Sequence, residues 1–117
     1  SRLFVDGIEI PQNTVVTSGG ISALQTQAQS LTIGSYQNNS TNSGRHFAGE
    51  LREFGIFAGD KSSKAALYYN GGTPYNLINE DGLQGYWKMN EGSGSVVKDF
   101  SNQGNDGTID GATWDKE

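Results

Sequence analysis

A loop near the end of the chain gathers the side chains best suited to holding a metal ion. Residues 99–107 read DFSNQGNDG, so carboxylate and amide oxygens alternate with glycines. Ca²⁺ takes about six to eight oxygen ligands from carboxylates, amides and backbone carbonyls. The side chains of Asp99, Asn105 and Asp106, with carbonyls around Asn102 and Gly104, would supply several of them. The alternative is an Asx-type turn without an ion, because Asn, Asp and Gly also favour tight turns.

The negative charge of the chain lies in its last third. Residues 1–79 carry five acidic and five basic side chains, whereas residues 80–117 carry eight acidic and three basic ones, which gives the net charge of −5. This is the sign expected around a bound cation, although an acidic solvated surface is the commoner explanation. We do not expect nucleic acid as a partner, because phosphate binding requires an excess of Lys and Arg.

The composition excludes or disfavours several other classes of protein. The chain has no cysteine, so it forms neither a disulfide framework nor a thiolate metal site. No apolar run approaches the length needed to span a bilayer, and no signal peptide is visible. The chain begins with Ser1 rather than Met, so we expect that residue 1 is not the start of the gene product.

Aromatic rings are the second candidate for binding, because sugars stack on exposed Trp and Tyr side chains. We assign Tyr36, Tyr75 and Trp87 to such a site. Trp87 follows Tyr86 in a predicted strand, so the two rings face opposite sides of that strand. The alternative that we favour for Trp87 is a place in the core.

No catalytic constellation is recognisable, and we expect a protein that is not an enzyme. Glu50 and Glu53 are three residues apart, so on a strand they would point to opposite faces. No convincing Ser/His/Asp set forms around the single histidine, His46.

The pattern of elements predicts an all-β domain with one short helix. The 117 residues suffice for one domain, and 17 glycines suit a thin, turn-rich β fold. Asp6-Gly7 predicts a two-residue hairpin turn, and residues 60–70 are the helix candidate, ended by Gly71-Gly72. Apolar residues on both faces of residues 47–57 indicate a central strand of a two-layer sandwich. The other predicted strands are residues 2–6, 8–10, 15–17, 30–35 and 84–90, with a short one before the 99–107 loop and two after it, the last at 111–114. We expect residues 84–90 to contact residues 47–57, either within the chain or across to a neighbour.

Motifs in the chain resemble a known family. GYWKMNEGSG at residues 85–94, the loop at 99–107 and GATW at 111–114 resemble the opening of a laminin-G-like, concanavalin A-type jelly roll of bacterial and phage surface proteins. RLFVDGIEI at 2–10 and FAGELREFGIF at 47–57 resemble strands from the later half of that family. The resemblance implies an antiparallel β-sandwich, partial or permuted, in which Glu53 adds a ligand to the calcium loop. Arg52 departs from the family, which usually has Asp there.

The late-half motifs precede the early ones, which reverses the order of a family domain. We divide the chain into late-half strands and helix at 1–72, a connector at 73–81, and the early segment at 82–117, in the same sandwich or opening a following one. Three interpretations stay open: a junction of tandem domains, a fragment of a larger sandwich, and a complete permuted domain. In the first two, edge strands pair with protein outside this sequence.

The resemblance implies a non-catalytic module of a secreted, cell-surface or virion-surface protein. Its role would be adhesion, glycan recognition or assembly. The alternatives are a purely structural repeat or decoration unit of a fibre or shell and, more distantly, an accessory domain of a polysaccharide-degrading enzyme. The expected partners are carbohydrate or neighbouring protein subunits, in a homo-oligomer or larger assembly and without membrane insertion.

Overall fold

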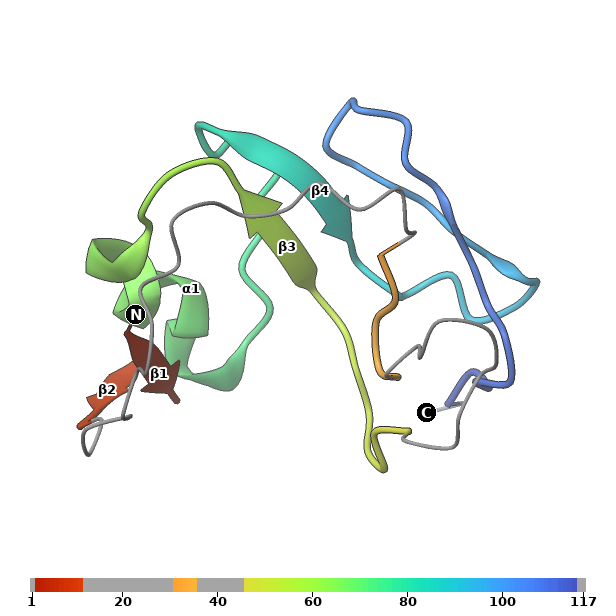
Figure 1. The fold of residues 1–117 in the computed structure, drawn as a ribbon, viewed down its shortest axis with the longest axis horizontal. Coiled ribbons are helices and arrows are strands. Elements are labelled where there is room, and N and C mark those ends of the chain that lie inside the picture. Colours follow the sequence, from red (N-terminus) through yellow and green to blue (C-terminus); the bar gives the residue numbers. More distant parts are fainter. Residues whose placement is uncertain (1, 12–30, 36–45, 116–117) are drawn as a thin grey trace, which may run out of the picture. The chain divides into compact units, whose positions relative to one another are not determined.

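A computed structural model describes residues 2–11, 31–35 and 46–115 of the chain. The chain divides into two compact units: a larger one of Ser1–Gln12 with Glu50–Glu117, and a smaller one of Asn13–Gly49. Figure 1 traces the elements in chain order. Within the described ranges, no helix is both long enough and apolar enough to cross a membrane.

The larger unit begins with the predicted hairpin, β1 (Leu3–Val5) and β2 (Ile8–Ile10). Asp6 and Gly7 have φ of 51° and 74°, the left-handed backbone that a tight hairpin turn requires. The register pairs Leu3 with Ile10 and Val5 with Ile8. The hairpin prediction is therefore confirmed.

A second antiparallel pair, β3 (Phe54–Phe57) and β4 (Leu83–Trp87), lies at the centre of the larger unit. Phe54 lies opposite Trp87, which confirms the prediction that these two segments of the chain make contact. Both strands are shorter than predicted, because Glu53 and Met89 have φ of 55° and 56° and turn the backbone out of the extended region. The central position predicted for the strand at 47–57 is not seen in the described part of the chain, where β4 is the only strand beside β3.

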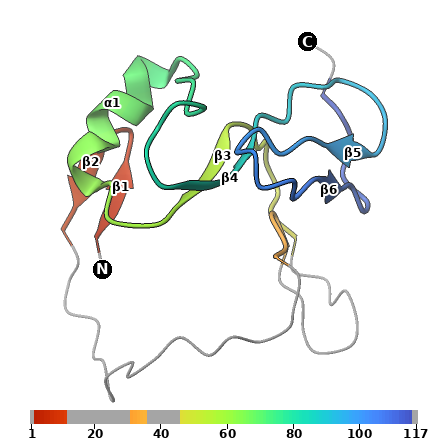
Figure 2. The ribbon, with the colours of Figure 1, turned by 90° about the horizontal axis from the view of Figure 1, so that it is seen from above.

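The predicted helix is confirmed between β3 and β4. A 3₁₀ turn (Ser62–Lys64), α1 (Ala65–Tyr69) and a second 3₁₀ turn (Asn70–Gly72) follow one another. The Asp60 carboxylate accepts a hydrogen bond from the Ser62 amide at 2.8 Å, in the turn that leads into the first 3₁₀ turn, whose N-cap residue is Lys61. Asn70 ends α1 at φ 47°. The helix lies beside the β1–β2 hairpin (Figures 1 and 2), where any Cβ on Gly7 would come within 3.1 Å of the Ala66 backbone.

The last segment forms a third pair, β5 (Val96–Val97) and β6 (Gly107–Thr108). The two strands flank the 99–107 loop, as predicted. A further strand expected at residues 111–114 is not formed. Trp114 lies there in irregular chain, and its indole N–H donates to the Gly94 carbonyl at 2.8 Å.

The core of the larger unit is small and rich in aromatic rings. The buried apolar side chains are Leu77, Leu83, Tyr86 and Trp87, and the rings that pack around them are only partly buried. Residues 73–81, the predicted connector, supply Leu77 and the partly buried Tyr75. The result is a small, mostly-β fold with one short helix, whose described strands form three two-stranded sheets.

The smaller unit is described at residues 31–35 and 46–49. Ser35 and His46 form an isolated antiparallel bridge, and the Phe47 amide donates to the Gly34 carbonyl at 2.7 Å. The strand predicted at 30–35 therefore reduces, in the described part, to this single bridge. The strand predicted at 15–17 lies outside the described residues.

Candidate functional site

The 99–107 loop is organised by the buried carboxylate of Asp99. Its Oδ1 accepts hydrogen bonds from the amides of Tyr86 at 3.0 Å and Ser101 at 2.9 Å, and its Oδ2 accepts one from the Asn105 amide at 3.0 Å. The Asp99 amide in turn donates to Asp106 Oδ1 at 2.8 Å. The structure thus brings together the Asp99 carboxylate, the Asn105 amide and the Asp106 carboxylate within the loop. The loop is therefore organised by hydrogen bonds from backbone amides to the Asp99 carboxylate.

The backbone of the loop fits this arrangement. Asn102 has a φ of 70° and Gly104 a φ of 74°, and Asn is the residue other than Gly that best tolerates this region. Ser101 is buried, and its hydroxyl donates to the Gln84 carbonyl at 3.2 Å. Asn102 therefore has a conformational role in turning the loop around Asp99.

The pKa of Asp99 is lower than that of an ordinary aspartate. Burial alone raises the pKa of this carboxyl, but hydrogen bonds from Ser101 and from the amides of Tyr86 and Asn105 lower it by more. The carboxylate is therefore ionised at neutral pH and neutralised by amide dipoles. These amides use acceptor positions that a calcium ion would otherwise coordinate.

Trp87, the last residue of β4, holds the 99–107 loop against this strand through a hydrogen bond. Only 7% of this residue is exposed, and its indole N–H donates to the Asn105 carbonyl at 2.9 Å. Its ring lies 6.1 Å from that of Phe54 on the paired strand. Trp87 is thus a core residue, the alternative favoured for it from the sequence. Of the other two residues assigned to sugar stacking, Tyr75 is partly buried on the connector and packs against the core, and Tyr36 lies outside the described residues.

Glu53 does not join the Asp99 loop. Its carboxylate accepts a hydrogen bond from the Tyr86 hydroxyl, whereas Asp99 accepts from the Tyr86 amide. The two carboxylates therefore contact opposite ends of one buried tyrosine. Among the residues that the structure describes, no group of three or more His, Cys, Asp or Glu side chains is arranged to hold a metal ion.

A second group of polar side chains is centred on the carboxylate of Glu80, a residue that was not predicted from the sequence. Its side chain accepts hydrogen bonds from Lys64, from the Tyr68 hydroxyl at 2.9 Å and from the Tyr75 hydroxyl at 3.3 Å. The hydrogen bond from Lys64 is the main cause of its lowered pKa. These four residues are spread over residues 64–80 and form no recognisable motif. The one local signal is that Glu80 follows a partly apolar stretch, residues 75–79.

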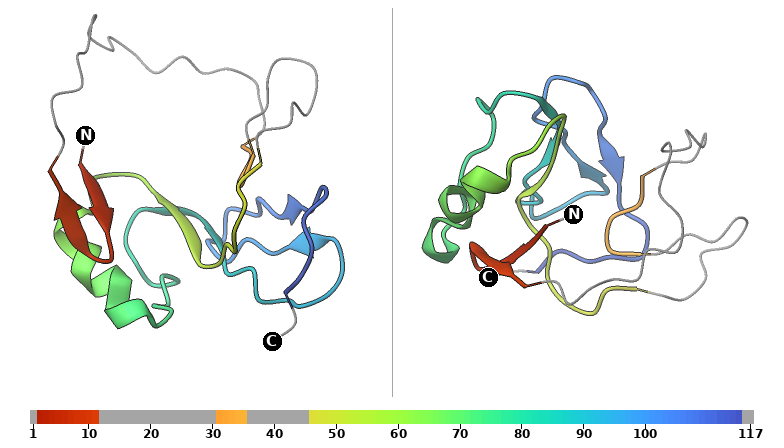
Figure 3. Two further views of the ribbon diagram at one scale, coloured as in Figure 1. Left: turned by 90° about the horizontal axis from the view of Figure 1, so that it is seen from below. Right: turned by 60° about the vertical axis from the view of Figure 1, so that its left-hand side comes forward.

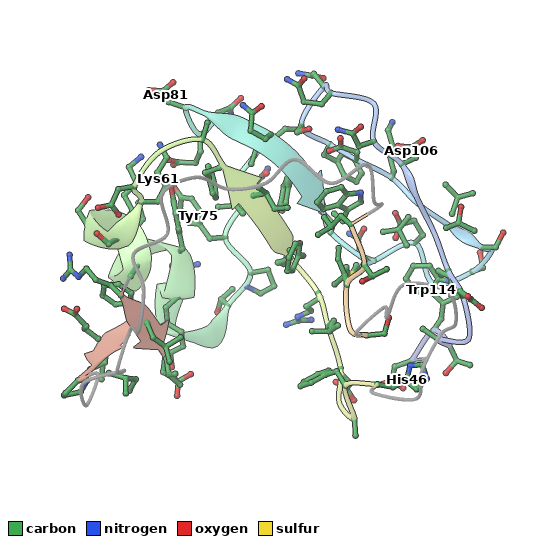
Figure 4. The ribbon with its side chains drawn as sticks, viewed as in Figure 1. His46, Lys61, Tyr75, Asp81, Asp106 and Trp114 are labelled. Atoms are coloured by element: carbon green, nitrogen blue, oxygen red, sulfur yellow. The ribbon has the colours of Figure 1, made fainter. Side chains whose placement is uncertain are left out.

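A groove of about 530 Å³ opens between the hairpin and the start of the helical segment. Arg2 crosses it: its guanidinium makes a two-pronged ion pair with Glu9, at 2.8 and 2.6 Å, and donates to the Ser62 hydroxyl at 3.0 Å. Lys61, labelled in Figure 4, lies with its ammonium 5.5 Å from the centre of the Phe57 ring. The groove is lined by Arg2, Phe4, Asp60, Lys61, Ser62, Ala65 and Tyr68.

The opposite face of the hairpin is entirely aliphatic. Directly opposed residues of an antiparallel pair project to the same side, so the register places Leu3, Val5, Ile8 and Ile10 on one face. These side chains are 51%, 51%, 69% and 39% exposed. We call this set the aliphatic face. The other face carries Arg2, Phe4 and Glu9, and Arg2 donates from it to Ser62 at the start of the helical segment. The ribbon shows the hairpin beside α1 (Figure 3).

Comparison with known proteins gives no match to a family model, to a curated protein or to a solved structure.

Proposed function

We propose that this chain is a non-catalytic, laminin-G-like β module of a secreted, cell-surface or virion-surface protein, and that its role is to join a larger assembly through protein contacts. The observation that carries the proposal is the aliphatic face of the β1–β2 hairpin. Exposed aliphatic side chains scattered singly need no explanation, but a contiguous set marks a binding surface. Here four of them share one side of a two-stranded ribbon.

The environment of the carboxylates supports a role without catalysis. The Asp99 carboxylate accepts hydrogen bonds from three backbone amides, and the Glu53 carboxylate accepts one from the Tyr86 hydroxyl. The Glu80 carboxylate accepts hydrogen bonds from Lys64 and from two tyrosine hydroxyls. Each of these groups is occupied by a contact that joins segments of the fold. The lowered pKa of Asp99 and of Glu80 is also opposite to what a general acid at neutral pH requires.

The test is a pair of substitutions introduced into the natural protein. Val5 and Val96 are both valines in short strands, with 51% and 53% of the residue exposed. We expect Val5→Lys to prevent assembly, because a charge on the aliphatic face cannot be buried without a partner, and Val96→Lys to leave assembly intact. Circular dichroism of each variant verifies that it folds. Normal assembly of a folded Val5→Lys protein would contradict the proposal.

The groove favours glycan recognition as a second candidate function. Its rim offers donors from Arg2, Lys61 and Ser62 and an acceptor from Asp60, and the rings of Phe4 and Tyr68 give it apolar wall. A few polar groups around an apolar lining are typical of small-molecule sites, and about 530 Å³ is within their usual size.

A glycan array separates the two candidates. Glycan recognition at the groove predicts binding that Lys61→Ala weakens and Lys98→Ala does not, since Lys98 lies near the Phe100 ring outside the groove. A purely structural module binds no glycan on the array.

A further inference from the structure

The aliphatic face points to a specific partner. We propose that it docks on the same face of a second copy of this chain, so that two hairpins pack face to face. This inference rests on the proposed role in assembly and adds the identity of the partner.

The geometry of the face is self-complementary. Leu3 lies opposite Ile10 and Val5 opposite Ile8, so each end of the ribbon presents one aliphatic pair. Two such ribbons related by a twofold axis bring aliphatic pairs against aliphatic pairs, which is the requirement of an isologous interface. The expected spacing is that of stacked sheets, about 10 Å.

The distribution of charge favours a second copy at this surface over other surfaces of the chain. The hairpin and the helical segment, residues 2–11 and 60–72, carry three basic and three acidic side chains and are neutral. The net charge of −5 arises in residues 80–117. Two copies that meet through their hairpins therefore bring neutral surfaces together, whereas contact through the acidic part would place like charges opposite each other.

Packing by faces is also favoured over strand addition at the edge of the hairpin. In the described ranges, neither β1 nor β2 has a second strand beside it. Each strand has three residues, and Pro11 follows β2 directly. An edge this short offers few backbone hydrogen bonds, and Pro removes a donor.

The small size of the face predicts a weak dimer. A standard interface involves about 20–30 residues on each side, whereas the aliphatic face has four. Association should therefore depend on concentration and be visible by sedimentation equilibrium between about 10 μM and 1 mM.

The experiment compares the wild-type chain with Val5→Lys, Ile8→Thr and the control Val96→Lys. We expect the wild-type chain and Val96→Lys to dimerise with dissociation constants within about twofold of each other, and Val5→Lys to weaken the dimer at least about tenfold. Ile8→Thr keeps a β-branched residue in the strand and tests the face if Val5→Lys unfolds the hairpin. It should weaken the dimer too.

Two results would overturn the inference: a wild-type chain that stays monomeric at about 1 mM, or variants of the face that dimerise as strongly as Val96→Lys. If the chain is monomeric and Val5→Lys still blocks assembly of the natural protein, the proposed function stands and the partner is a different protein surface. If Val5→Lys leaves assembly intact, the proposed function fails as well.

Discussion

At the scale of single residues, carboxylates with several hydrogen-bond partners hold the irregular parts of this fold together. Asp99 accepts hydrogen bonds from amides of β4 and of its own loop. Glu80 connects the helical segment to residues 73–81 through hydrogen bonds from Lys64 and two tyrosines. The fold has only four buried apolar side chains among the described residues. Polar contacts of this kind therefore matter more here than in a protein with a large core.

Substitution of Asp99 tests its structural role. Asp99→Ala leaves the amides of Tyr86, Ser101 and Asn105 without their acceptor, so we expect a loss of about 3 kcal/mol in the free energy of unfolding. The exposed Asp81→Ala is the control and should change stability by less than about 0.5 kcal/mol. Denaturant unfolding measures both variants.

The same substitution separates the amide-organised loop from the calcium site predicted from the sequence. If the amides account for the role of Asp99, Asp99→Ala lowers the melting temperature equally in EDTA and in calcium. A loss seen only in calcium, together with a wild-type chain that calcium stabilises, would instead support an ion in the loop.

The buried Tyr86 gives stability a dependence on alkaline pH. Burial, and secondarily the Glu53 carboxylate, raise the pKa of Tyr86 to about 12 from 10.0. A pKa that is higher in the folded state stabilises fully below the unfolded value and loses its contribution as pH rises from 10 through 12. The contribution lost is about 3 kcal/mol.

Chemical denaturation between pH 9 and 12 measures this loss, with tyrosinate absorbance as the readout of ionisation. The control is Tyr86→Phe, which cannot ionise at this position and should show a shallower decline. Tyr68, whose pKa burial also raises to about 12, contributes the decline that remains. Equal slopes for wild-type and Tyr86→Phe proteins would argue against the assignment.

At the scale of elements, the sequence predicted those that local chemistry decides. Asp6-Gly7 specifies the hairpin turn, and the helical segment at residues 62–72 lies at the helix candidate and ends at Gly71-Gly72. Contact between residues 47–57 and β4 was predicted as well.

The sequence could not predict where the strands end, because residues of ordinary type interrupt them. Glu53 and Met89 adopt positive φ although neither residue type favours it. Glu53 is held there by tertiary contacts: its carboxylate accepts from Tyr86 and its amide donates to the Lys88 carbonyl at 3.2 Å. The role of Glu80 also depends on partners brought together by folding.

Closure of the β3–β4 pair depends on Gly82. Its φ is +77°, and a Cβ there would lie 2.5 Å from the Ala58 carbonyl oxygen. The Ala58 amide donates to the Gly82 carbonyl at 2.7 Å, so the two backbones cannot separate without loss of this bond.

We therefore expect Gly82→Ala to destabilise the fold by about 3 kcal/mol, the sum of backbone strain and steric overlap. Gly92→Ala is the matched control, since Gly92 has a φ of +70° with no atom within 4 Å of an added Cβ. Strain alone should cost it about 1 kcal/mol. Equal thermal shifts in the two variants would show that contact with Ala58 is unimportant.

At the scale of the whole molecule, the two faces of the β1–β2 hairpin have different roles. Its Arg2, Phe4 and Glu9 side faces the helical segment, so the hairpin is attached to the larger unit through polar and aromatic contacts. The aliphatic side is the one that the proposed assembly contact would use. If the hairpin were attached to its own core by aliphatic packing, Leu3, Val5, Ile8 and Ile10 would face the core and the charged side chains would face solvent.

Site-specific thiol labelling tests this central claim most directly. The chain has no cysteine, so Ile8→Cys places a single thiol on the aliphatic face and Ser93→Cys places one on an exposed turn. We predict that a maleimide labels Ile8→Cys at least about tenfold more slowly in the natural assembly than in the dilute isolated chain, because the partner covers it. Ser93→Cys should label at the same rate in both. Equally fast labelling of Ile8→Cys in both states would contradict the account.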